Sequence, residues 1–413
     1  MGKVQKNKLN SVKKIKIFND PIYGFVHVHN KLVYKIIQHP YFQRLRRISQ
    51  MGLSYLVYPG AHHTRFHHAL GCVFLMQKGI DTLRLKGVKI SNQEEEGLLI
   101  SILLHDIGHG PFSHALENSI VSTDHEEISL QFMRSLNKEF DGKLDLAIDI
   151  FTNRYPRKFM HQLVSGQLDM DRLDYLKRDS FYTGVAEGNI NSDRLISMMT
   201  VFEDQLVLEE KGIYSAEKFI LARRMMYWMA YLHKTGVAAE HVLVNVLKRA
   251  KELIGQGIEV QCTEALSYFL KAQKAEVKME ALSIHMFALL DDNDVLSALK
   301  LWSGHADLVL AELCRSLLNR KLPKIEMFSE PIPQGYVNKK ELKYLTKNQI
   351  DRKDIGYFVF TGEIKLKVYD SQFKNIQLLN KQGDLLDLAE SSDLFRASSF
   401  SESISKYYIC YPK

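Results

Sequence analysis

The stretch LHDIGHGPFSH (residues 104–114) decides the fold class and the chemistry expected of this chain. It follows an apolar run, and its glycines and proline predict that a buried helix ends there. The adjacent pair His105 and Asp106 is costly to bury at such a helix end unless its polar groups find partners. Imidazole and carboxylate together suit a divalent transition metal. The stretch therefore predicts a helix that ends at a cavity able to hold a metal ion.

Two further positions complete a set of candidate metal ligands. His68, within RFHH, offers a second imidazole, and Asp171, within LDMDRLDY, offers a second carboxylate. Two nitrogens and two oxygens with open coordination positions are typical of a catalytic rather than a closed structural site. We predict that His68, His105, Asp106 and Asp171 bind one divalent ion. The donor set does not distinguish Mn, Fe, Zn, Mg, Co or Ni.

Outward from this stretch, the sequence is mainly helical. Ser91 and Glu94 have the spacing of a capping box ahead of the apolar run. After Asp20 and Pro21 we expect helix, with only one short hairpin in the segment VFEDQLVLEEKGIY (residues 201–214). Apolar residues recur at helical spacing in residues 126–136, 160–178, 192–201, 215–233 and 238–254.

The last third of the chain changes character. Apolar and polar residues alternate in residues 356–370 and 374–388, with a turn signal at residues 381–384, and the end KYYICYPK resembles a strand. We predict a mainly α protein with three parts: a basic N-terminal arm (1–17), a helical domain (18–320) and a small α+β domain (321–413).

Composition narrows the class of protein. The chain has 413 residues, of which 46% are hydrophobic and 25% charged, as in a soluble protein with a large core. No apolar run approaches the roughly 20 residues of a membrane span, and the N-terminus lacks a secretory signal, so we expect a cytoplasmic protein without membrane contact. The net charge, 55 − 48 = +7, permits an anionic ligand. The 4 cysteines are scattered, which argues against disulfides or a cysteine-based zinc site.

The H…HD…D pattern resembles that of the HD-domain phosphohydrolases. The resemblance is closer still to the deoxynucleoside triphosphate triphosphohydrolases, the group that includes the sterile-alpha-motif and HD-domain enzyme. Because the similar region begins near residue 16, we expect no sterile-alpha-motif domain. The resemblance is dense over residues 16–235. The segments that carry it are NDPIYG (19–24), FQRLRR (42–47), YPGA (58–61), RFHH (65–68), HDIGHGPFSH (105–114), DRLDY (171–175) and RD (178–179).

This resemblance implies hydrolysis at the α-phosphorus of a deoxynucleoside triphosphate, which releases a deoxynucleoside and intact triphosphate. His125 matches the general acid that protonates the leaving 5′-oxygen. Glu117 stands in the place of its carboxylate partner, where relatives have Asp. The positions that hold the phosphates are matched by Arg65, His109, His114 and Arg172.

The resemblance also implies a set of substrate contacts. Gln50 and Asp179 match residues that hydrogen-bond the sugar 3′-hydroxyl, and Tyr175 matches the ring beneath the sugar, whose packing would exclude a 2′-hydroxyl. Arg223, Tyr227 and Tyr231 have i, i+4, i+8 spacing, so we expect them on one helical face. By resemblance, Arg223 binds the terminal phosphate, Tyr231 lines the sugar or base, and Tyr227 replaces a histidine.

Regulation is a further expectation from the resemblance, since relatives bind an activating nucleotide between subunits. Lys16, Asn19, Gln43 and Arg46 match that allosteric pocket. Gln38 stands where the well-known enzyme has an Asp that reads guanine, so a different effector base, or none, is implied. We expect a homo-oligomer, either a dimer or a tetramer.

Other interpretations remain open at this stage. A different HD phosphohydrolase would act on single-stranded nucleic acid or on nucleoside monophosphates, and a non-catalytic nucleotide sensor would bind without turnover. Taken alone, Tyr227 and Tyr231 could be core residues, and Arg44, Arg46 and Arg47 a solvated helix face. The histidines His62, His63 and His67 are given no role.

Overall fold

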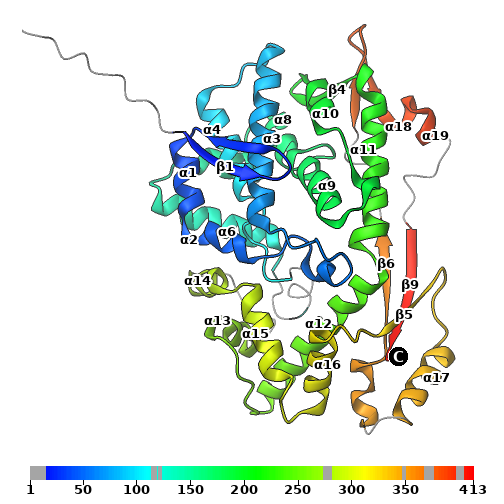
Figure 1. Cartoon of the computed structure of the whole chain (residues 1–413). Coiled ribbons are helices and arrows are strands. Elements are labelled where there is room, and N and C mark those ends of the chain that lie inside the picture. Colours follow the sequence, from blue (N-terminus) through cyan, green and yellow to red (C-terminus); the bar gives the residue numbers. More distant parts are fainter. Residues whose placement is uncertain are drawn as a thin grey trace, which may run out of the picture.

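The computed structural model describes residues 15–112, 119, 123–272, 281–346, 350–366, 376–396 and 404–413. Helices form most of this structure, as Figure 1 shows, which confirms the mainly α fold class. The helices of the N-terminal two thirds are α1 (Lys31–Gln38), α2 (Pro40–Gln43), α3 (Arg65–Leu85), α4 (Asn92–Leu104), α6 (His125–Glu139), α7 (Asp145–Phe151), α8 (Lys158–Val164), α9 (Met170–Thr183), α10 (Ser192–Met198), α11 (Ile213–Met226) and α12 (Lys234–Gly255).

The remaining helices follow α12 in the chain. These are α13 (Glu264–Lys271), α14 (Ala281–Leu289), α15 (Asp292–Trp302), α16 (Leu308–Leu318), α17 (Gln334–Leu345), α18 (Leu388–Ser391) and α19 (Asp393–Arg396). Short 3₁₀ segments span Arg44–Arg47, Gly52–Leu56, Ala186–Gly188, Glu210–Gly212 and Arg352–Tyr357, and Tyr227–Tyr231 forms a π-helical turn. Within the described residues, no helix is both long enough and apolar enough to cross a membrane.

Helices α3 and α4 form the centre of the helical body, and each packs against the other. The run Leu98–Leu104 is buried at every position, as expected of a helix that is surrounded by others. The side chain of Ser91 accepts from the backbone nitrogen of Glu94 at 3.2 Å, and the Glu94 carboxylate accepts from the backbone nitrogen of Ser91 at 2.8 Å. The predicted capping box is therefore confirmed.

The N-terminal segment differs from the prediction, because it forms a hairpin rather than leading directly into helix. Strand β1 (Lys16–Asp20) pairs antiparallel with β2 (Gly24–Val28), as Figure 1 shows. Phe18 packs on the core, and Val26 lies on the same buried face, while Ile17 and Phe25 are 55% and 66% exposed on the other face. Because both faces carry apolar residues, the alternation that marks a half-buried strand is weak here.

Three C-terminal strands form an antiparallel sheet in the order β5-β9-β6, beside α17 (Figure 1). Its members are β5 (Lys324–Phe328), β6 (Phe360–Leu366) and β9 (Ile404–Tyr411). Strand β6 lies within the alternating stretch 356–370, and β9 overlaps the predicted terminal strand 406–413, so both predictions are confirmed.

The alternating stretch 374–388 is also confirmed as strand, but its two strands join a different sheet. Strands β7 (Gln377–Leu379) and β8 (Leu385–Asp387) pair across the expected turn. Strand β7 also runs parallel to β4 (Gln205–Glu209), which forms the predicted hairpin with β3 (Met199–Phe202). The resulting sheet, β3-β4-β7-β8, ties residues 377–387 to the helical part of the chain. The division of the chain at residue 320 stays a prediction.

Glu240 on α12 is expected to make stability depend on pH. Burial raises the pKa of Glu240 to about 7. The folded state therefore holds a proton that the unfolded state releases, so this contribution to stability is complete below the ordinary glutamate pKa and is lost as pH rises towards 7. We expect Glu240→Gln to unfold at nearly the same denaturant concentration as wild type at pH 5, and to be more stable by about 1–3 kcal/mol at pH 8. Equal effects at both pH values in denaturant titrations would contradict this.

Candidate metal centre

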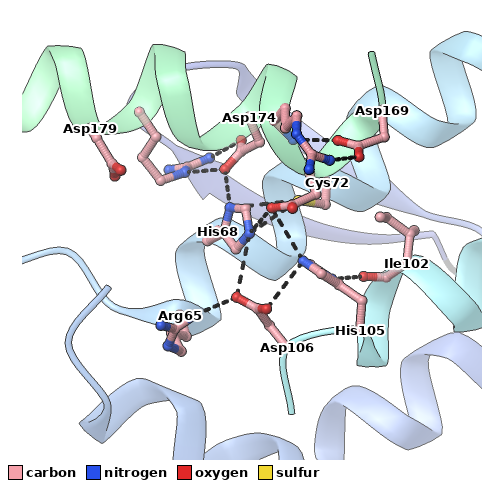
Figure 2. A network of polar contacts seen from close by, with 12 residues as sticks. Arg65, His68, Cys72, Ile102, His105, Asp106, Asp169, Asp174 and Asp179 are labelled. Atoms are coloured by element: carbon pink, nitrogen blue, oxygen red, sulfur yellow. Dashed lines mark hydrogen bonds and ion pairs between the residues drawn. The ribbon is translucent and has the colours of Figure 1, made fainter. Parts of the chain in front are cut away.

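Three helix ends converge on one point of the helical body. Helix α3 presents His68 from its first turn, α4 ends at His105 with Asp106 next, and α9 presents Asp171 from its first turn. Figure 2 shows His68, His105 and Asp106 pointing toward one another. His68 is fully buried, and the exposed fractions of His105 and Asp106 are 8% and 9%. The structure thus brings together all four candidate metal ligands.

The donor atoms of these residues lie close enough to share one cation. His68 Nε2 is 3.1 Å from Asp171 Oδ1 and 3.7 Å from Asp106 Oδ2. His105 Nε2 is 3.4 Å from Asp171 Oδ1 and 3.5 Å from Asp106 Oδ1. These separations are wider than ideal hydrogen bonds in all but one case.

The opposite edges of both imidazoles face hydrogen-bond acceptors. His68 Nδ1 lies 2.7 Å from Asp174 Oδ2, and His105 Nδ1 lies 2.7 Å from the carbonyl oxygen of Ile102. Because these partners can only accept, each Nδ1 carries a proton, and each Nε2 is left to face the carboxylates. Two buried carboxylates that face one another across these Nε2 atoms need positive charge between them, supplied by protons on the rings or by a cation. The chemistry of the donor set therefore fits a divalent metal ion.

Electrostatics at the two carboxylates agrees with this. Burial alone would raise the pKa of Asp171, but hydrogen bonds from His105 and His68 hold it below its usual range. Burial opposes ionisation of Asp106 too, yet His109, His105 and Arg65 hold its pKa well below the usual range. Both side chains are therefore in the anionic form that binds metals.

A buried chain of charges supports His68 from behind. Asp174 accepts from Arg178 Nε at 2.8 Å and Nη2 at 3.0 Å, and Arg178 Nη1 donates to Asp20 at 2.8 Å. Asp20 also accepts from the backbone nitrogens of Ile22 and Tyr23, so the turn of the β1–β2 hairpin fixes its position. The chain links this turn to a candidate metal ligand.

Gly71 on α3 leaves room for the Asp174–Arg178 ion pair. A Cβ atom at this position would lie 2.0 Å from Asp174 Oδ1 and 2.3 Å from Arg178 Nη2. A larger residue would therefore displace the pair that orients His68.

Cys72 is a possible donor that the sequence analysis did not consider. Its sulfur lies 3.6 Å from both ring nitrogens of His68, and it belongs to a group of donors with His68, His105 and Asp171 whose atoms lie within 4.8 Å of one another. Burial raises the pKa of the Cys72 thiol, which favours the neutral thiol over the thiolate that binds metals. Asp106 is therefore the better fourth ligand.

Arg44 holds the loop that follows the His105-Asp106 pair. It is fully buried and donates to the carbonyl oxygens of Ile107 at 2.7 Å, His109 at 3.0 Å and Leu290 at 3.2 Å. Burial lowers its pKa to about 9. The alternative that Arg44 lies on a solvated helix face is therefore wrong, whereas Arg46 and Arg47 are exposed.

Two histidines lie beside the candidate ligands. His109 Nδ1 is 3.3 Å from Asp106 Oδ1, and the ring centroids of His109 and His125 are 4.1 Å apart. His125 is half-buried at the first position of α6. Glu117, the predicted carboxylate partner of His125, and His114, predicted to hold a phosphate, lie outside the described residues.

The three arginines assigned to phosphates are each held by a side chain of the site. Arg65 forms an ion pair with Asp106. Arg172 forms an ion pair with the buried Asp169, and Arg223 donates to the Gln167 side chain at 3.1 Å. The last two partners belong to the turn between α8 and α9.

The residues assigned to the sugar and base also lie together. The Tyr231 hydroxyl donates to Asp179 Oδ2 at 2.8 Å. The Tyr231 ring packs edge-on against Tyr175, with centroids 6.0 Å apart, and against Tyr227, with centroids 5.3 Å apart. The Gln50 Oε1 atom is buried and has no hydrogen-bond partner among the described residues.

The backbone at these tyrosines differs from the continuous α-helix expected. Helix α11 ends at Met226, and Tyr227–Tyr231 forms a π-helical turn, a local form often found at functional sites. Arg223 still lies near Tyr227, with its guanidinium carbon 5.9 Å from the ring centroid.

The four possible allosteric residues lie around the β1–β2 hairpin. The Lys16 ammonium lies 4.9 Å from the ring centroid of Tyr34, and Asn19 is exposed on β1. Arg46 Nε donates to Gln43 Oε1 at 2.9 Å, and its guanidinium covers the ring of Phe66. Their allosteric role stays a proposal.

Several residues of the site were missed by the sequence analysis: Asp20, His63, Cys72, Asp169, Gln167, Asp174 and Arg178. The i, i+3 and i, i+4 spacings of Asp171, Asp174 and Arg178 could have placed them on one face of α9. Cys72 and Asp169 likewise have i, i+4 and i, i+3 spacing to His68 and Arg172. Asp20, His63 and Gln167 act across long sequence separations, so no local pattern marks them.

Two imidazoles and two carboxylates that can hold a cation, with basic side chains nearby, are the chemistry expected of a metal-dependent hydrolase of anionic substrates. The HD domain model matches residues 65–179 and the HD associated region matches residues 190–261. A crystal structure of a phosphohydrolase from Bacteroides thetaiotaomicron is 49% identical, with a TM-score of 0.94, and covers 97% of this chain and 100% of that one. The chain belongs to the HD-domain phosphohydrolase family.

Two curated relatives are also similar. The uncharacterised protein YwfO of Bacillus subtilis is 31% identical, over 96% of this chain and 92% of its own length. The human deoxynucleoside triphosphate triphosphohydrolase SAMHD1 is 28% identical, over 59% of this chain and 46% of its own length. The similarity thus spans about half of SAMHD1.

Proposed function

We propose that this chain is a metal-dependent deoxynucleoside triphosphate triphosphohydrolase that releases a deoxynucleoside and triphosphate. One observation carries the proposal: Asp171, a candidate metal ligand, lies on helix α9 together with Arg172, Tyr175 and Asp179, the residues assigned to phosphate and sugar. A site that binds both the phosphates and the sugar of a nucleotide next to one cation suits a nucleoside triphosphate. The similarity to SAMHD1 supports the same substrate class.

In this proposal each group of side chains has a separate role in the reaction. A divalent ion held by His68, His105, Asp106 and Asp171 would polarise a phosphate oxygen and lower the pKa of an attacking water. Arg172 and Arg223 would bind the phosphate chain, since guanidinium groups match phosphate geometry. Asp179 would accept from the sugar 3′-hydroxyl, and Tyr175 would pack against the sugar.

Proton delivery to the leaving 5′-oxygen falls to His125 in this proposal. Its ring lies against His109, which in turn contacts Asp106, so the imidazole is placed beside the candidate ligands. A general acid of this kind contributes roughly 10²–10⁴-fold to the rate. Glu117 is proposed as its partner.

The test is product analysis with each of the four deoxynucleoside triphosphates, added singly and as a mixture, with Mn²⁺ or Mg²⁺. Chromatography is expected to show free deoxynucleoside together with tripolyphosphate. Orthophosphate with a nucleoside diphosphate would contradict attack at the α-phosphorus. Tight nucleotide binding without turnover would favour a sensor.

The same experiment tests the regulatory proposal. Activity with the mixture but not with single nucleotides would support activation at Lys16, Asn19, Gln43 and Arg46. We also propose a dimer or tetramer, which light scattering with and without nucleotides would reveal. Strongly salt-dependent binding of single-stranded DNA would instead favour a nucleic acid partner.

Arg223→Ala is expected to raise KM for the triphosphate at least about tenfold with a smaller change in kcat, because a charged hydrogen bond to phosphate is lost. Arg224→Ala, at the next position of α11, serves as the matched control and is expected to change KM less than about twofold. Equal effects of the two substitutions in steady-state kinetics would contradict the assignment.

A further inference from the structure

His63 is a buried histidine next to the substrate-binding residues that has no assigned role. Its side chain is fully buried, and Nε2 lies 2.7 Å from Asp179 Oδ1. Its ring stacks on that of Tyr182 with centroids 4.4 Å apart and an interplanar angle of 14°. Its position is therefore fixed by a hydrogen bond on one edge and a ring on one face.

The contacts of His63 identify which of its ring nitrogens donates a hydrogen bond. The Asp179 carboxylate can only accept, so Nε2 carries a proton and donates. Nδ1 is buried and has no hydrogen-bond partner among the described residues. A proton on Nδ1 would have no acceptor among the described residues, so the ring donates through Nε2.

Both carboxylate oxygens of Asp179 accept hydrogen bonds. Oδ1 accepts from His63, and Oδ2 accepts from the Tyr231 hydroxyl at 2.8 Å. Each carboxylate oxygen retains a further lone pair, so the fixed group can still accept from a substrate hydroxyl. The donors set the direction in which those lone pairs point.

His63 also fixes the backbone of Gln50. Its carbonyl oxygen accepts from the Gln50 backbone nitrogen at 3.0 Å. His63 therefore contacts both residues that are assigned to the sugar 3′-hydroxyl: its ring contacts the Asp179 side chain, and its carbonyl oxygen contacts the Gln50 backbone.

We infer that His63 is a positioning residue that fixes the Asp179 carboxylate and thereby sets recognition of the deoxyribose 3′-hydroxyl. The inference rests on the proposed function, because it concerns the sugar of that substrate. His63 acts through Asp179 and does not touch the substrate. Its loss should therefore weaken the use of substrates that carry a 3′-hydroxyl and spare those that lack one.

The test compares a deoxynucleoside triphosphate with its 2′,3′-dideoxy analogue, using the full chain with Mn²⁺. His63→Phe keeps an aromatic ring against Tyr182 and removes the donor, whereas His63→Gln can place an amide N–H near the position of Nε2. We expect His63→Phe to lower kcat/KM about tenfold for the deoxy substrate and less than about twofold for the dideoxy substrate. His63→Gln should recover most of the loss, and His62→Phe, at the exposed neighbouring position, should behave as wild type.

Each contrary outcome has a distinct meaning. Equal losses on both substrates, or full activity of His63→Phe on the deoxy substrate, would overturn the inference while the proposed function stands. Absence of hydrolysis by the wild-type protein would overturn the proposed function and this inference with it. If His63→Phe fails to fold, as judged by thermal unfolding, the ratio of the two substrates for His63→Gln and His63→Asn provides the comparison. The shorter Asn amide should fail to reach Asp179 and lose discrimination.

Discussion

Asp106→Ala is expected to lower kcat/KM for the triphosphate by at least about 10³-fold and to leave the purified protein with little bound metal. The substitution removes one of the two carboxylates that face the imidazoles and frees Arg65 from its ion pair. Metal ions contribute several kcal/mol to stabilising charge in hydrolytic transition states, and each 1.4 kcal/mol corresponds to tenfold in rate. Steady-state kinetics and elemental analysis measure the two effects.

A matched control separates this effect from the loss of any surface carboxylate. Asp193→Ala removes an exposed aspartate that pairs with Lys78 at 2.9 Å, and it should leave both metal content and rate unchanged. Full metal content in Asp106→Ala, with unchanged turnover, would show that the candidate centre is not the site of reaction.

Arg178→Ala is expected to destabilise the protein by about 3–5 kcal/mol, because it leaves two buried carboxylates without their partner. Arg178 is fully buried, and it bonds both Asp174 and Asp20. Since Asp174 orients His68, metal affinity should also fall about 10–100-fold. Denaturant titration of the metal-free protein and metal-binding titration measure these two effects separately.

The control for this prediction is an exposed ion pair. Arg154 lies 3.0 Å from Asp149 at the surface, so Arg154→Ala should cost less than about 1 kcal/mol. If Arg178→Ala does not fold, Arg178→Lys keeps the charge but not the forked contact and should show a smaller loss. Wild-type stability in either Arg178 variant would be inconsistent with the buried chain of charges described above.

The sequence predicted the helical architecture because its signals are local. The capping box at Ser91 and the apolar run behind it need no knowledge of the rest of the chain. The turn between β7 and β8 was equally predictable, because the sequence places a glycine there. In the structure Gly383 adopts a positive φ of 93°, a conformation that favours glycine. The pairing of β7 with β4 was not predictable from the sequence, because it joins residues about 170 positions apart through short strands of three and five residues.

Long-range contacts also explain what was missed in the candidate site. The four proposed ligands carry a recognisable pattern of residue types, and the structure brings them together. His63 shows no such signal, because its importance depends on Asp179, 116 residues away. The burial of Arg44 was not evident from the sequence either, because its partners are the backbone carbonyl oxygens of His109 and Leu290, which are distant in the chain. The β1–β2 hairpin escaped notice because both of its faces are partly apolar.

The central claim is that one divalent ion lies among His68, His105, Asp106 and Asp171. Anomalous diffraction from crystals of the metal-loaded protein tests it directly. We predict a single peak about 2.0–2.2 Å from both Nε2 atoms and from an oxygen of each carboxylate. A peak bonded to the Cys72 sulfur in place of Asp106, or no peak within reach of these side chains, would contradict the claim.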